Sequence, residues 1–175
     1  MPVVSGSSGR GVATSLAPLI GMQYIELESR RFPDGEGYVR VPTDAIDAVR
    51  SEPVVLVSNT YPDSGIVNTV LLLEAIADVR RGDLSNLKGE EPQSMEDVGS
   101  GVYLAIPYYG YSRQDKRFSK GEAVSARVIA EILKRACDGI TILDLHEPAV
   151  LDAMDVPIEF VSSMPEIAEL LQSEV

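Results

Sequence analysis

The sequence has few of the residues on which metal centres, disulfides and membrane spans depend. It holds one cysteine and one histidine among 175 residues, which excludes an intramolecular disulfide and disfavours a cysteine-based zinc site. No apolar run reaches the roughly 18 residues that a membrane helix needs. Residues 1–8 lack the basic segment followed by an apolar one that marks a secretory signal. We therefore expect a cytoplasmic protein with no membrane partner.

Basic residues are also scarce. Lys and Arg together number 15 against 27 Asp and Glu, which gives a net charge of −12. This balance argues against nucleic acid as a partner, because nucleic-acid binding needs a basic footprint. The length and the 45% of hydrophobic residues predict one globular domain with its own core. Cys137 follows an apolar helical segment, where it is expected to be a small buried thiol.

Apolar runs of strand and helix period alternate along the chain. This alternation predicts an α/β fold with a mostly parallel sheet, helices on both faces and one small antiparallel hairpin. Strands are expected at residues 3–4, 23–27, 38–41, 53–58, 102–106, 139–146 and 155–160. Helices are expected at residues 10–20, 43–50, 65–81, 123–136 and 166–171. Residues 82–100 are rich in polar residues and are predicted to be a long, partly disordered loop.

The positive charges that do exist gather in one loop. Arg113, Lys116, Arg117 and Lys120 fall within eight residues, between the strand 102–106 and the helix that follows. A cationic loop at a strand end that leads into a helix is suited to bind phosphate oxygens. The alternative is a solvated basic turn, which charge alone does not exclude.

Two other strand ends carry weaker signals. The small residues Ser5 to Gly9 could form a phosphate nest, but their glycine spacing matches neither the dinucleotide fingerprint nor the P-loop, which favours a plain connection. Strand alternation through residue 146 would place Asp144 and His146 on one face at the carboxyl end of a strand. Open α/β sheets bind ligands at that end, so this pair is either structural or a contact for metal or phosphate.

A turn signal lies between the expected strands 23–27 and 38–41. Pro33-Asp34-Gly35 is turn chemistry and predicts a hairpin between these two strands. Phe32 beside it is expected to anchor the hairpin; the alternative is an exposed ring that stacks on a purine.

Three motifs in order resemble ribose-phosphate pyrophosphokinase (PRPP synthetase), particularly its archaeal form. They are Arg31 to Glu36, Tyr108 to Glu122, and Asp144-Leu145-His146; Val3 to Ser7 and Asn59 to Asp63 are similar to further segments of that family. The resemblance covers nearly the whole chain except residues 82–101, where the family usually has a tight connection, and so implies that the polar residues 82–100 are an insertion. It implies a phosphoribosyltransferase-like sheet, and an enzyme family that transfers diphosphate from ATP to ribose 5-phosphate.

The resemblance also implies roles for single residues. Phe32 would stack on adenine in the site of a neighbouring subunit, and Asp34 and Glu36, on either side of Gly35, would bond to the base. A homo-oligomer is therefore expected.

The phosphates and the metal would meet the other two motifs. Arg113 and Gln114 would contact the ATP phosphates, with Asp115 and Lys116 close by. His146 would bind near Mg²⁺ or the β- and γ-phosphates, and Asp144 would orient it or support the metal.

The family's second catalytic domain is expected to be absent from residues 1–175. The sequence contains no Asp-Asp-x-x-x-Thr-Gly-Gly-Thr-like loop, which in the family binds ribose 5-phosphate. The chain is therefore expected to be an N-terminal domain that contacts ATP and is inactive alone. A non-catalytic regulatory or assembly module related to the family is the alternative.

Overall fold

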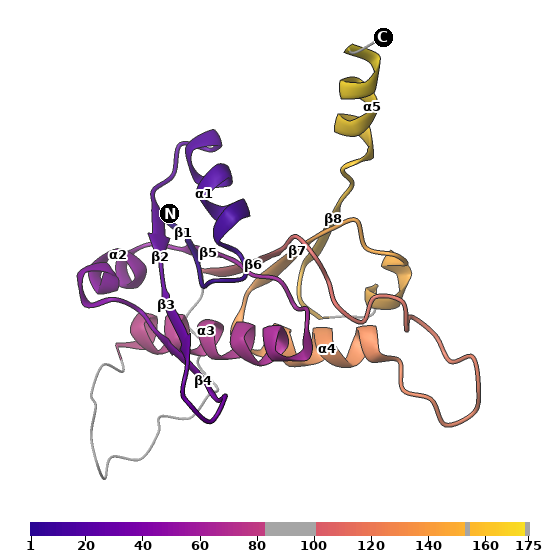
Figure 1. Ribbon diagram of the computed structural model, residues 1–175, viewed down its shortest axis with the longest axis horizontal. Coiled ribbons are helices and arrows are strands. Elements are labelled where there is room, and N and C mark those ends of the chain that lie inside the picture. Colours follow the sequence, from indigo (N-terminus) through magenta and orange to yellow (C-terminus); the bar gives the residue numbers. More distant parts are fainter. Residues whose placement is uncertain (83–100, 153–154, 174–175) are drawn as a thin grey trace.

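The computed structural model of the chain describes residues 1–82, 101–152 and 155–173. Its core is a six-stranded, all-parallel sheet of strand order β2-β1-β5-β6-β7-β8, and a separate antiparallel hairpin, β3-β4, packs beside α3 (Figure 1). The predicted α/β fold with one small hairpin is confirmed. The expected polar insertion lies, from residue 83 on, outside the described residues.

The elements alternate as the sequence pattern predicts. The strands are β1 (Val3–Ser5), β2 (Tyr24–Glu26), β3 (Glu28–Arg31), β4 (Gly37–Arg40), β5 (Val54–Val57), β6 (Val102–Ile106), β7 (Gly139–Leu143) and β8 (Ile158–Val161). The α-helices are α1 (Arg10–Leu19), α2 (Ile46–Ser51), α3 (Asp63–Arg81), α4 (Ser125–Leu133) and α5 (Met164–Ser173). Short 3₁₀ turns at Thr43–Ala45, Lys134–Ala136 and Pro148–Leu151 adjoin or connect them.

Helices cover the sheet from both faces, and the chain changes direction between two neighbouring strands. Helix α1 packs on β1, β2 and β5, whereas α3 and α4 lie together on the other face (Figure 1). From β1 the chain crosses through α1 to β2 on one side; from β5 it crosses through α3 to β6 on the other. The boundary between β1 and β5 is therefore the switch point at which open α/β sheets form a crevice.

The first strand of the hairpin differs from the prediction, which was wrong on this point. Residues 23–27 were expected to pair with 38–41, but Tyr24–Glu26 pairs in parallel with β1 instead, at the edge of the main sheet. The strand opposite β4 is Glu28–Arg31, with Glu28 facing Arg40 and Arg31 facing Gly37. A hairpin pairs the residues that directly flank its turn, and the crossover through α1 is long enough to place the preceding strand beside β1.

The core fills the space between the sheet and the helices with the apolar runs of the strands. Leu56 and Leu104 of the central strands are buried against Leu72, Leu73 and Ile76 of α3. Among the helices that the structure describes, none is both long and apolar enough to cross a bilayer.

The single thiol belongs to this core. Cys137 is buried, as predicted, and its Sγ donates to the Leu133 carbonyl oxygen at 3.4 Å. Burial, and next the charge of Asp138, raise the pKa of the thiol to about 12. The thiolate is therefore scarce at neutral pH, and the residue is unsuited to nucleophilic chemistry.

Candidate functional site

The loops that follow β1, β5 and β6 meet at the carboxyl edge of the sheet and are bonded to one another. Asn59 bridges two of them: its Nδ2 donates to the Ser8 carbonyl oxygen at 2.8 Å, and its Oδ1 accepts from the Tyr108 N–H at 3.0 Å. Thr60 adds a backbone bond to Tyr108 at 3.2 Å and accepts from the Gly110 N–H at 2.8 Å. The edge is thus a connected surface rather than a set of independent loops.

The tyrosines after β6 have different tasks. Tyr109 is buried, and its hydroxyl donates to the Ala126 carbonyl oxygen of α4 at 2.6 Å. Burial raises its pKa, so it stays a neutral anchor. Tyr108 and Tyr111 are exposed, and the Tyr111 hydroxyl donates to Asp63 Oδ1 at 2.6 Å. This contact ties the start of the cationic loop to the first turn of α3.

The cationic loop is closed by a carboxylate from its own end. Glu122 Oε2 accepts from the N–H groups of Phe118 and Ser119, at 2.6 and 2.9 Å, and the Glu122 carbonyl oxygen accepts from Arg117 Nε at 2.9 Å. The bonds from Ser119 and then Phe118 lower the pKa of Glu122. The side chains of Arg113 and Lys116 are exposed and form no ion pair with another described residue. The Lys116 ammonium lies 5.5 Å from the centroid of the exposed Phe118 ring.

We expect Glu122→Gln to open this loop. The lowered pKa means that the ionised carboxylate holds the loop closed above the ordinary glutamate pKa of 4.5, and that closure is lost as the pH falls through the lowered value. The amide accepts more weakly than the carboxylate, so trypsin should cleave after Arg117 about threefold to tenfold faster at pH 8. Glu169→Gln, on exposed α5, is the control. Equal cleavage rates in both variants would contradict the role of Glu122.

The hairpin turn holds Phe32 from one side. Gly35, at φ 95°, and Asp34 close the turn, in which Asp34 Oδ1 accepts from the Glu36 N–H at 3.1 Å. The Phe32 and Tyr38 rings meet edge to face with centroids 5.6 Å apart. The Arg30 guanidinium lies 4.9 Å from the Phe32 centroid and 4.1 Å from that of Tyr38.

This packing is compatible with both predictions for Phe32, a ring that anchors the hairpin and an exposed ring that stacks on a ligand. The ring anchors the hairpin through Tyr38 and Arg30, as the simpler prediction has it. It is still 39% exposed, so part of its surface is available to a ligand or a second subunit.

Asp144 and His146 do not share a face of β7. The strand ends at Leu143, and Asp144 has a left-handed backbone, φ 48°, so strand alternation stops before it. The Asp144 carboxylate accepts from the Ser163 hydroxyl, and from the Ser163 N–H at 2.9 Å, which lowers its pKa. His146 is exposed. No three His, Cys, Asp or Glu side chains in the described ranges lie close enough together to hold a metal ion.

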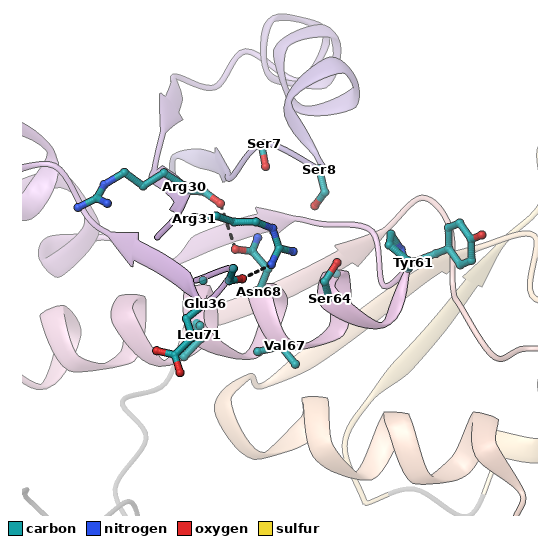
Figure 2. Close-up of a pocket in the computed structure, with 15 residues that line it drawn as sticks. Ser7, Ser8, Arg30, Arg31, Glu36, Tyr61, Ser64, Val67, Asn68 and Leu71 are labelled. Carbon is teal, nitrogen blue, oxygen red and sulfur yellow. Dashed lines mark hydrogen bonds between the residues drawn. The ribbon is translucent and has the colours of Figure 1, made fainter. Parts of the chain in front are cut away.

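A groove of about 570 Å³ lies at the switch point between β1 and β5. Its walls are the β1–α1 loop at Ser7 and Ser8, hairpin residues 29–31 and 35–37, and the end of the β5–α3 loop with the first turns of α3, between residues 61 and 71 (Figure 2). Of the predicted site residues, only Gly35 and Glu36 line it. The sequence signal for this groove was the loop of small residues after β1.

An all-parallel sheet flanked by helices, with the loops after several strands gathered at its carboxyl edge, places the chain in the doubly wound α/β class of proteins. Residues 98–137 match the family model described as the N-terminal domain of ribose phosphate pyrophosphokinase. The crystal structure of phosphoribosylpyrophosphate synthetase from Mycobacterium smegmatis has the same fold, with a TM-score of 0.74 and 18% identity, over 98% of this chain and 51% of that one.

Curated relatives carry the same name. Ribose-phosphate pyrophosphokinase of Methanothermobacter thermautotrophicus is 36% identical over 170 residues, which are 95% of this chain and 52% of that protein. The Halobacterium salinarum protein is 30% identical over 173 residues, which are 99% of this chain and 54% of that protein. The chain is thus a relative of the N-terminal domain of ribose-phosphate pyrophosphokinases, as its motifs indicate, and spans about half the length of these relatives.

Proposed function

We propose that this chain is the ATP-binding half of a ribose-phosphate diphosphokinase, a cytoplasmic enzyme that transfers diphosphate from ATP to ribose 5-phosphate. The observation that carries the proposal is the exposed cationic loop at the carboxyl edge of the sheet, in a chain related to enzymes of that name. Transfer of a phosphoryl or diphosphoryl group depends on positioning and charge neutralisation. The four basic residues that this otherwise acidic chain keeps in one loop supply the charge neutralisation.

In this proposal the phosphates of ATP bind to the cationic loop. Arg113 and Lys116 present exposed cationic groups, and Gln114 and Asp115 lie half-buried between them. An arginine bonds to phosphate oxygens through two parallel N–H groups, whereas lysine acts as a mobile point charge. The closure of the loop by Glu122 limits the entropy that would be lost when ATP binds.

The adenine binds to the hairpin of a second copy of the chain. Phe32 offers the ring surface that Arg30 and Tyr38 leave open, and the backbone turn fixed by Asp34 presents Glu36 beside it. This arrangement needs a homo-oligomer, because the hairpin and the loop then complete one site from two subunits.

Mg²⁺ fits this site only as a partner of the ATP phosphates. Asp144 is the one carboxylate in the Asp144-x-His146 motif, and it is already held by Ser163. Magnesium is commonly bound by one or two carboxylates together with substrate phosphates. Asp144 and His146 are thus the residues that would meet the ion, which neutralises phosphate charge when bound.

Replacing Arg113 by alanine should weaken the binding of Mg-ATP to the purified chain. Loss of a charge-assisted hydrogen bond to phosphate lowers affinity about tenfold or more, which titration calorimetry measures directly. Arg127→Ala removes an exposed arginine of α4 and serves as the control for net charge. Equal affinity of the wild type and Arg113→Ala would refute the assignment of the loop.

The isolated chain should not make AMP from ATP in the presence of ribose 5-phosphate. The sugar-phosphate loop of the family is not found in this sequence, so that loop does not position the acceptor hydroxyl for transfer here. The measurement is ribose-5-phosphate-dependent AMP release by pure protein. Release above the rate without the sugar would overturn this part of the proposal. A chain that binds neither ATP nor the sugar phosphate would instead support a non-catalytic assembly module.

A further inference from the structure

The groove at the switch point lies apart from the cationic loop and the Asp144-x-His146 motif of the proposed ATP site, and of that site's residues it shares only Gly35 and Glu36 of the hairpin. None of Arg113 to Lys116, Asp144 and His146 lines it. We propose that this groove is a second, separate binding site, which takes the phosphate group of a small phosphomonoester or free inorganic phosphate. The inference goes beyond the proposed function, because it holds whether or not the cationic loop binds ATP.

The β1–α1 loop, which forms one wall of the groove, requires glycine at positions 6 and 9. A Cβ on Gly9 would lie 1.9 Å from the Val57 carbonyl oxygen, and one on Gly6 would lie 2.9 Å from Leu72 Cδ1. The loop after β1 therefore packs tightly against β5 and α3. This approach carries Ser7 and Ser8 to the groove, where the Ser8 and Ser58 hydroxyls are 3.2 Å apart. The small residues of the loop after β1 thus allow this loop to pack closely against β5 and α3 at the edge of the groove.

The charge in the groove comes from Arg31. Figure 2 shows its guanidinium directed into the space between Ser8, Ser64 and Asn68, whereas Arg30 points away. Arg31 Nη1 donates to the Gly35 carbonyl oxygen at 2.6 Å, which fixes the side chain across the turn. Among the described residues Arg31 forms no ion pair. A fixed guanidinium without a carboxylate partner is suited to a doubly charged phosphate.

Neutral donors stand around this guanidinium. Asn68 Oδ1 accepts from the Ser29 hydroxyl at 3.0 Å, which leaves the Asn68 amide N–H groups to face the groove. The Ser7, Ser8 and Ser64 hydroxyls come from two other segments. Hydroxyl and amide donors beside one arginine are the usual companions of a phosphate group.

The nearest carboxylates are turned elsewhere or already engaged. The Glu36 carboxylate is directed out of the groove (Figure 2). Asp63, at the start of α3, accepts from the Tyr111 hydroxyl at 2.6 Å. The helices α1 and α3 both begin beside the groove without a side-chain cap, and their dipoles add positive potential. The local field therefore favours an anion in a chain whose net charge is −12.

The size and the far wall allow more than a bare ion. The volume of about 570 Å³ falls in the range of small-molecule sites. Val67 and Leu71 of α3 form an apolar side, and Tyr61 stands exposed at the rim. A small organic group attached to the phosphate has room against these side chains.

The test is NMR titration of the ¹⁵N-labelled full chain with inorganic phosphate and, separately, glycerol 3-phosphate, at constant ionic strength. We expect saturable shifts centred on Ser7, Ser8, Arg31 and Ser64. Arg31→Gln should weaken this binding about tenfold or more. Arg40→Gln, whose arginine pairs with Glu28 on the same hairpin, is the matched control and should leave it unchanged.

Arg113→Ala separates this site from the proposed ATP site, because it should leave phosphate binding in the groove intact. Tighter binding of glycerol 3-phosphate would identify a phosphomonoester as the ligand, and equal or weaker binding would identify free phosphate. The proposal fails if the shifts centre on residues 113–120, if they grow linearly without saturation, or if Arg31→Gln binds like the wild type.

Discussion

Replacing Gly9 by alanine should destabilise the fold by at least about 2 kcal/mol, within the range of severe overpacking. The added Cβ would lie 1.9 Å from the Val57 carbonyl oxygen and 2.6 Å from its carbon, which are backbone atoms of β5 rather than a movable side chain. The backbone of Gly9, at φ −101° and ψ −6°, lies outside the left-handed region and is allowed for alanine. The cost is therefore steric, and the β1–α1 loop or β5 must move to relieve it.

Gly11→Ala is the matched control for this prediction. Gly11 lies inside α1, and a methyl group added there would point into open space, with no atom of another segment within 4 Å. Alanine at this position should stabilise the helix by up to about 1 kcal/mol, because glycine is the weaker helix former. Urea unfolding followed by circular dichroism measures both changes. If both variants had the same stability, the close approach of the loop to β5 would be refuted.

Leu104→Ala should cost about 2–5 kcal/mol, the range measured for leucine truncation in well-packed cores. Leu104 is 1% exposed and sits in β6, paired with Leu56 on one side and Ile140 on the other. The cavity would open at the centre of the sheet, where the strands on either side limit collapse.

The same substitution at Leu19 shows what burial contributes. Leu19 ends α1 and is 82% exposed, so its truncation should change the free energy of unfolding by less than about 0.5 kcal/mol. Both values follow from chemical denaturation at equilibrium. A Leu104 variant as stable as the Leu19 variant would contradict the packing of the central strands.

Much of the fold follows from the sequence because apolar runs and their period determine where elements lie. The strand predicted at residues 102–106 has those bounds, and the long amphipathic segment is α3. The pairing of the hairpin could not be read in the same way. Tyr24–Glu26 and Glu28–Arg31 are adjacent short strands, and only the tertiary path through α1 decides which of them joins the main sheet.

A candidate site could be predicted from the sequence where its residues are contiguous, and not where they come from distant segments. The cationic loop is contiguous, so its charge and its place after a strand were visible in the sequence. The groove combines Ser7, Arg31 and Asn68, which are far apart along the chain, and no single motif announces it. At Asp144, alternation failed because a left-handed backbone at a residue other than glycine leaves no mark in the sequence.

The all-parallel sheet also constrains how the chain folds. Val3 of β1 lies opposite Tyr24 of β2 on one side and Val55 of β5 on the other, so one of the two partners of the first strand lies more than fifty positions further along the chain. The hairpin β3-β4 and the single helices can form early from local contacts, but each sheet pairing must first close a loop through a crossover. We therefore expect these non-local pairings to slow folding, and the groove forms only once the β1–α1 loop, the hairpin and the start of α3 have come together.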